Sequence, residues 1–111
     1  MESSGAEPRI VLVLTTLGAD VDAAALAQTL VDERLAACVN VLPVMMSVYR
    51  WKGTIETDRE QQLVIKTTAA HVGALEARLR ALHPYEVPEF LVVPVDGASD
   101  AYRDWLLGSV E

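Results

Sequence analysis

Two long extended segments joined by a tight turn constrain the fold of this chain more than any other feature. The segments are predicted over residues 36–50 and 54–68, and a tight turn at residues 51–53 connects them. Pro43 has no amide hydrogen to donate to a strand ladder, so it predicts a bulge or a locally unpaired edge in the first segment. Strands about twice the usual five or six residues in length should form a hairpin that extends beyond the rest of the domain.

Two further strands and two helices are predicted around this hairpin. Residues 9–16 form a continuous apolar run rich in β-branched side chains, which is typical of a strand buried on both faces. Residues 89–95 give the fourth strand. The spacing of apolar residues predicts a first helix of about four turns, capped by Asp20 or Asp22, and a second helix over residues 69–83.

A short helix is predicted to close the chain over residues 98–107, capped by Ser99 or Asp100. Its inward face is predicted to carry Tyr102, Trp105 and Leu106. The order of elements is therefore βαββαβ plus a short C-terminal helix, which is the ferredoxin-like arrangement of an α+β sandwich with a long central hairpin. We expect residues 9–111 to form a single domain and residues 1–8 to form a flexible N-terminal tail.

Both helices should cover the same face of such a sheet. The opposite face would carry apolar side chains from the first and fourth strands, and the chain offers no further layer to cover them. A long hairpin also exposes strand edges, which proteins normally protect. Closed association of several copies would cover both surfaces, so the pattern predicts an oligomer.

Charge and cysteine content argue against several classes of function. The net charge is −7 with only nine basic residues, which argues against binding nucleic acid or an anionic membrane surface. No apolar run approaches the roughly 20 residues that a membrane-spanning helix needs. The single cysteine excludes an internal disulfide and fits a reducing compartment. We therefore expect a cytoplasmic protein.

Five short strings occur in order along the chain and resemble one known family. Residues 31–40 read V-x-x-R-L-A-A-C-V-N, residues 47–53 read S-x-Y-x-W-x-G, and residues 83–89 read H-P-Y-E-x-P-E. The remaining two strings are Glu60 followed by Lys66 and Thr67, and the closing pair Tyr102 and Trp105. Together they resemble the CutA family of divalent cation tolerance proteins from about Ile10 to Leu107.

The resemblance implies both an architecture and a role. It implies a ferredoxin-like homotrimer that is similar to the PII signalling proteins. It also implies that copper or a similar divalent cation is bound, although not tightly, and that the protein takes part in the response to metal ions. It implies no catalysed reaction, so we expect a protein that is not an enzyme.

Four residues are the candidate metal ligands: Cys38, His83, Glu60 and Glu89. A thiolate at Cys38 would suit copper(I), whereas a small buried side chain at a strand start is the simpler interpretation. His83 could bind a metal through its imidazole or could cap the second helix. Carboxylates at Glu60 and Glu89 could join a mixed site or be ordinary surface charges. The order of the strands predicts that these four residues surround one polar cleft at a subunit boundary.

Lys66, Tyr85 and Trp51 are predicted to line this cleft. Glu60 and Lys66 share strand parity, so an ion pair between them is an alternative. Tyr49, Trp51 and Trp105 are predicted to lie at subunit interfaces, where large amphipathic aromatic residues are enriched.

Three other functions stay open on the sequence alone. The first alternative is a PII-like small-molecule sensor or signalling trimer with a ligand cleft between subunits. A cysteine-dependent enzyme that uses Cys38 and His83 is a second alternative. The third is a rigid scaffold for another protein.

Overall fold

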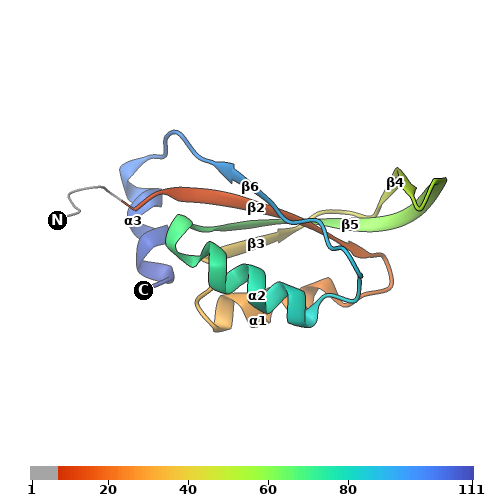
Figure 1. The fold of residues 1–111 in the computed structure, drawn as a ribbon. Helices are drawn as coiled ribbons and strands as arrows, with labels where there is room; N and C mark the ends of the chain where they lie inside the picture. The colour runs from red at the N-terminus through yellow and green to blue at the C-terminus, as the bar shows by residue number, and fades with distance from the viewer. Residues whose placement is uncertain (1–7) are drawn as a thin grey trace.

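A computed structural model describes residues 8–111 of the chain, so the predicted tail at residues 1–8 lies almost entirely outside the described residues. Strands and helices follow the predicted order (Figure 1). They are β2 (Ile10–Gly18), α1 (Ala23–Asp32), β3 (Cys38–Val41), β4 (Met45–Trp51), β5 (Thr54–Thr68), η1 (Ala69–His71), α2 (Val72–Leu82), β6 (Leu91–Pro94) and α3 (Asp100–Ser109).

The strands form one antiparallel sheet in the order β3-β5-β2-β6, and β4 also pairs with β5. Helices α1 and α2 both lie on one side of this sheet (Figure 1). The predicted α+β class and the strand–helix–hairpin–helix–strand order are therefore confirmed.

The hairpin has one continuous strand and one interrupted strand. β5 covers the predicted range, whereas its partner is divided into β3 and β4 by residues 42–44. Pro43 lies in that gap, as the missing amide hydrogen predicts. Lys52 and Gly53 both have positive φ values, 51° and 81°, which is the geometry of a tight two-residue hairpin turn.

The hairpin tip extends past the helices, and the described chain measures 49 × 27 × 25 Å (Figure 1). Apolar side chains on the hairpin therefore have little cover from the other described residues, and Met46 is 71% exposed. This confirms the expectation that the hairpin overhangs the domain.

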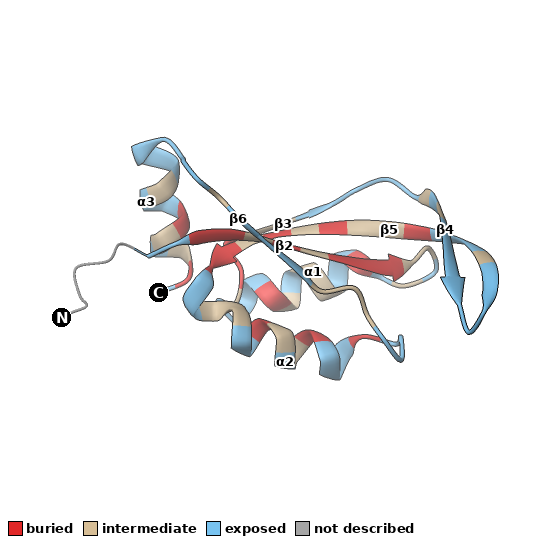
Figure 2. Ribbon diagram, turned by 45° about the horizontal axis from the view of Figure 1, so that its top comes forward, coloured by how far each residue is buried: buried red, intermediate tan, exposed pale blue. Residues whose placement is uncertain are grey.

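The main core lies between the sheet and the two helices, as the buried positions show (Figure 2). Val13, Leu17 and Leu63 project from the sheet, and Leu30 and Leu75 project from the helices. All five side chains are fully buried. A second, smaller cluster joins Leu106 and Val110 at the end of the chain to Ile10 and Ala37.

Helix α1 begins as predicted but is shorter than four turns. The side chain of Asp22 accepts a hydrogen bond from the amide of Ala25 at 3.0 Å. At the other end Arg34 has a φ of 60°, and the amides of Arg34 and Leu35 donate to the carbonyls of Val31 and Leu30. These paired bonds form a Schellman motif, which ends the helix at a residue in the left-handed conformation.

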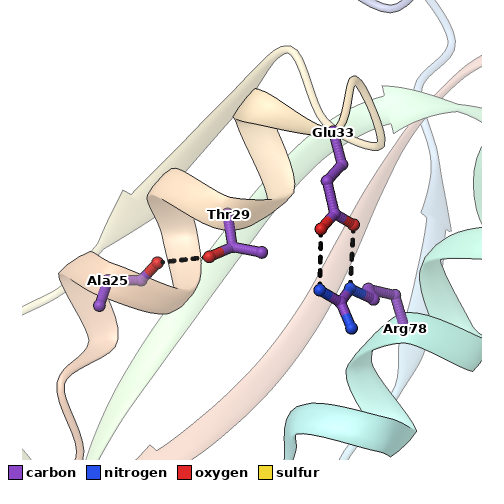
Figure 3. A network of polar contacts seen from close by, with 4 residues as sticks. All are labelled: Ala25, Thr29, Glu33 and Arg78. Carbon is purple, nitrogen blue, oxygen red and sulfur yellow. Dashed lines mark hydrogen bonds and ion pairs between the residues drawn. The ribbon is translucent and has the colours of Figure 1, made fainter.

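An ion pair connects the two helices (Figure 3). Arg78 donates from Nε and Nη2 to the two carboxylate oxygens of Glu33, at 2.9 and 2.8 Å. Both side chains are partly exposed, so the contribution to stability is modest despite the bidentate geometry. The pair fixes the C-terminal end of α1 against the middle of α2.

The inward face predicted for the closing helix is wrong for two of its three residues. Leu106 is buried, whereas Tyr102 and Trp105 are 42% and 49% exposed. Ser99 caps α3, as predicted, by accepting from the amide of Tyr102. The helix packs at one end of the sheet through Leu106, so its neighbouring aromatic positions lie outside the contact.

The sheet face opposite α1 and α2 carries an apolar patch, as the pattern of the first and fourth strands predicts. Leu12 is paired with Val93, and Leu14 is paired with Leu91. Paired residues project to the same side, so these four side chains form adjacent rows. Leu91 and Val93 are exposed in the single chain. We call the patch formed by these four residues the open face.

Helix α2 offers a matched test of the core. Leu75 is fully buried, whereas Leu82 on the same helix is 39% exposed. We expect Leu75→Ala to lower the free energy of unfolding by about 2–5 kcal/mol, because the cavity cannot collapse completely. The same substitution at Leu82 should cost under about 1.5 kcal/mol. Urea denaturation measures both, and equal losses would contradict this placement of the core.

Candidate functional site

A hollow lies between the hairpin and the segment that links α2 to β6. Its volume is about 700 Å³. Three aromatic side chains border it, namely Tyr49, Trp51 and Tyr85. Four carboxylates also border it, namely Asp58, Glu60, Glu86 and Glu89. Neither lysine, arginine nor histidine is among the described residues that line this hollow.

Strand register places the side chains that the hairpin contributes to the hollow on one face of the β4–β5 ladder. Met45 is paired with Glu60, and Ser47 is paired with Asp58. Tyr49 follows at the next position of the same parity. Alternate residues of a strand project to the same side, so one face of the β4–β5 ladder supplies the floor of the hollow.

Glu60 lies at the buried base of the hollow. Its side chain is only 7% exposed, and its Oε2 accepts a hydrogen bond from the hydroxyl of Tyr85 at 2.8 Å. Burial raises the pKa of Tyr85, and the hydrogen bond to Glu60 raises it further. The phenol therefore stays protonated and acts as a neutral donor to the carboxylate.

A second tyrosine–carboxylate pair lies nearer the hairpin tip. The hydroxyl of Tyr49 donates to Oδ2 of Asp58. This hydrogen bond, together with partial desolvation and the charge of Asp58, raises the pKa of Tyr49 to about 12. Both phenols thus hold one oxygen of a carboxylate and leave its negative charge unneutralised.

Glu89 closes the hollow from the opposite side. Its Oε2 accepts a hydrogen bond from Nε2 of Gln62 at 2.9 Å. The same amide nitrogen donates to the carbonyl of Thr15 at 2.9 Å, so Gln62 fixes Glu89 against the edge of β2. Glu60 and Glu89, both predicted site residues, therefore border one hollow.

His83 is buried, and its ring is fully engaged by the backbone. Its Nε2 donates to the carbonyl of Thr16 at 2.6 Å, and its Nδ1 accepts from the amide of Tyr85 at 3.1 Å. Neither ring nitrogen is available to a metal in this arrangement. His83 instead fixes the start of the segment that carries Tyr85, so the structure gives it a positioning role that the ligand prediction missed.

Cys38 and Lys66 lie away from the hollow. They are directly paired in the β3–β5 ladder and therefore project to the same side of the sheet as the open face. Lys66 Nζ contacts the hydroxyl of Tyr102 at 3.4 Å and forms no ion pair with Glu60. Glu60 is six residues along β5 from Lys66, which corresponds to about 20 Å.

The predicted cluster of four metal ligands is therefore not formed within one chain. Only Glu60 and Glu89 reach the hollow, while Cys38 and His83 lie elsewhere. Over residues 8–111, no three histidine, cysteine, aspartate or glutamate side chains are grouped closely enough to hold a metal ion. The histidine, cysteine and carboxylate side chains described in a single chain therefore do not form a copper site.

Two functional candidates were missed by the sequence interpretation, namely Asp58 and Gln62. Both share strand parity with Glu60, and this signal could have found them. Of the predicted cleft residues, Tyr85 and Trp51 border the hollow and Lys66 does not. The predicted interface residues Tyr49, Trp51 and Trp105 are all exposed in the single chain.

The sequence is similar to proteins named for divalent-cation tolerance. A protein of Thermus thermophilus named divalent-cation tolerance protein CutA is 44% identical over 95 residues, which cover 86% of this chain and 92% of the relative. A chloroplastic CutA protein of Arabidopsis thaliana is 41% identical over 108 residues, which cover 97% of this chain and 59% of the relative.

The fold is similar to solved structures of the same group. The structure of a divalent cation tolerance protein, Cut A1, from Thermus thermophilus has a TM-score of 0.87 at 41% identity and covers 92% of this chain and 99% of its own. A periplasmic divalent cation tolerance protein CutA from Archaeoglobus fulgidus has a TM-score of 0.87 at 26% identity, covering 92% of this chain and 99% of its own.

The names of these relatives refer to a chloroplast and a periplasm, so a cytoplasmic location for this chain stays a prediction. None of the helices described over residues 8–111 has the length and apolar character needed to cross a membrane. The sequence profile of the CutA1 divalent ion tolerance proteins matches residues 11–109. This chain belongs to the CutA1 divalent ion tolerance protein family.

Proposed function

We propose that this protein is a homotrimer that binds copper or similar divalent cations and takes part in the response to metal ions, without catalysing a reaction. The observation that carries the proposal is the family match over residues 11–109, which spans the fold from β2 to α3. Its relatives are named for divalent-cation tolerance.

The open face and the hairpin support association of several copies. Leu91 and Val93 are exposed on the open face, and Met46 and Val48 are exposed on the face of the hairpin that points away from the hollow. Removing apolar surface from water lowers the free energy by about 25 cal/mol per Å². Contact between these apolar surfaces on different copies therefore favours assembly. A closed ring of three copies would cover the exposed surface on every copy equally.

The proposed metal ligands come from more than one copy, because they lie too far apart within one. Cys38 is on the same side of the sheet as the open face, so assembly would place its thiol near a subunit boundary. A thiolate suits copper(I), and carboxylates such as Glu60 and Glu89 suit harder cations. Ligands shared in this way fit weak binding, since the site exists only in the assembled protein.

A second candidate function is that of a small-molecule sensor. The hollow of about 700 Å³ favours it, because ligand pockets commonly have volumes of about 300–1,000 Å³. A buried carboxylate and three aromatic side chains border this hollow, so it offers a ligand both a polar contact and apolar surface.

The oligomeric state tests the role of the open face. We expect light scattering to give three times the 12.1 kDa mass of the chain, and the melting temperature to rise with protein concentration. Val93→Asp should lower the mass, because it would bury a charge at the interface. Val31→Asp is the matched control, since Val31 is similarly exposed but lies on α1. A native mass of one chain would contradict the trimer.

Copper titration tests the ligands. We expect Cys38→Ser to weaken copper binding at least about tenfold, since Cys38 is the only cysteine in the chain and supplies its only thiolate ligand. Affinity should also fall as the pH is lowered, because protons compete for the ligand atoms. His83→Gln should lower stability and leave the affinity unchanged, because its ring nitrogens bind the backbone. Unchanged affinity in Cys38→Ser would exclude the thiol as a ligand.

A further inference from the structure

Among the residues that the structure describes, Glu60 is a buried carboxylate that has no cationic partner. Its one hydrogen bond among the described residues comes from a neutral phenol, that of Tyr85. The ion pairs described over residues 8–111 join Arg78 to Glu33 and Arg80 to Glu76, and neither involves Glu60. A buried charge is costly unless an opposite charge or several hydrogen bonds compensate it. The base of the hollow therefore favours a positively charged occupant.

The walls of the hollow favour an organic cation. Tyr49, Trp51 and Tyr85 border it, and the face of an aromatic ring attracts an ammonium group. The indole of Trp51 already shows this preference, because Nζ of Lys52 lies 5.6 Å from its ring centroid. Apolar atoms of Met45 and Val87 complete the lining, and such atoms suit methylene groups better than a hydrated metal ion.

The carboxylates are spaced along the hollow and do not converge on a point. Asp58 and Glu60 are two residues apart on one face of β5, which separates them by about 6.5–7 Å. Glu89 approaches from the segment before β6. A divalent metal ion needs oxygen ligands that all lie about 2–2.6 Å from one centre. Separated carboxylates instead match a molecule that carries several separated positive charges.

We propose that this hollow binds a linear polyamine, with protonated amines at Glu60 and Asp58 and with the intervening methylene groups against the aromatic walls. The inference rests on the second proposed function and names the chemical class of its ligand. The two tyrosine hydroxyls each occupy one carboxylate oxygen and so leave the other oxygen of each group for an amine. Selectivity comes from the combination of several charges with an apolar stem, which neither a metal ion nor a simple monoamine supplies.

Calorimetric titration of the native protein with spermidine tests this assignment at low ionic strength. We expect saturable binding of one spermidine per hollow, with tighter binding than that of butylamine. Glu60→Gln and Asp58→Asn should each weaken it about tenfold or more, because each removes one charge-assisted hydrogen bond. Both variants retain an oxygen that can accept from the neighbouring tyrosine, so the fold is kept.

The matched control is Asp104→Asn, which removes the same charge from α3, at the end of the molecule remote from the hairpin (Figure 1). Its spermidine affinity should stay within about twofold of the native value, since a charge at the far end of the 49 Å molecule interacts only weakly through water with a ligand in the hollow. An equal loss in Asp104→Asn and Glu60→Gln would mean that only overall charge attracts the polyamine, and this would overturn the assignment.

Two further measurements separate this inference from the proposed metal function. Cys38→Ser should bind spermidine as the native protein does, because Cys38 lies outside the hollow. Absence of saturable spermidine binding, with copper binding retained, would overturn the inference and leave the metal function standing. Loss of oligomer mass in Glu60→Gln would also overturn it, because the hollow would then hold a basic side chain of a second copy.

Discussion

Pairing along β5 is the constraint on which the rest of this structure depends. The inner half of β5, residues 60–68, pairs with β2 on one edge and with β3 on the other. The outer half, residues 54–60, pairs with β4. Its inner half carries Leu63 and Ile65 into the core, so the hydrophobic effect fixes the register of the whole sheet. A slip of one residue would turn these side chains to the open face and would move Glu60 away from the hollow.

The same register gives one strand two different environments. In the inner half, the helices bury one face. None of the described helices covers the outer half, because they end before the hairpin does (Figure 2). Exposed apolar side chains thus gather on the hairpin and on the open face. A chain that folds in this way buries a core beneath its helices but leaves part of its apolar surface exposed.

The hollow arises where these two environments meet. Asp58 and Glu60 come from the outer half of β5, while Tyr85 comes from the segment after α2. His83 connects that segment to β2 through the carbonyl of Thr16, and Gln62 connects Glu89 to the same strand. Polar residues at this junction therefore serve two purposes, because they both satisfy buried backbone groups and set the shape of a charged, aromatic hollow.

The sequence was sufficient to predict the order of elements, the hairpin, the break at Pro43 and a cap at Asp20 or Asp22, because these depend on local periodicity, missing donors and side-chain bonds to nearby amides. The structure selects Asp22 as the cap. The sequence also predicted that Glu60, Glu89, Tyr85 and Trp51 would lie around one cleft, and these four residues border the same hollow. The six-residue spacing along one predicted strand already separated Lys66 from Glu60. The folded structure was needed to separate Cys38 from that site, because the register of β3 on β5 pairs it with Lys66. It likewise decided that His83 binds the backbone, since Thr16 is remote in sequence and only folding brings its carbonyl to the imidazole.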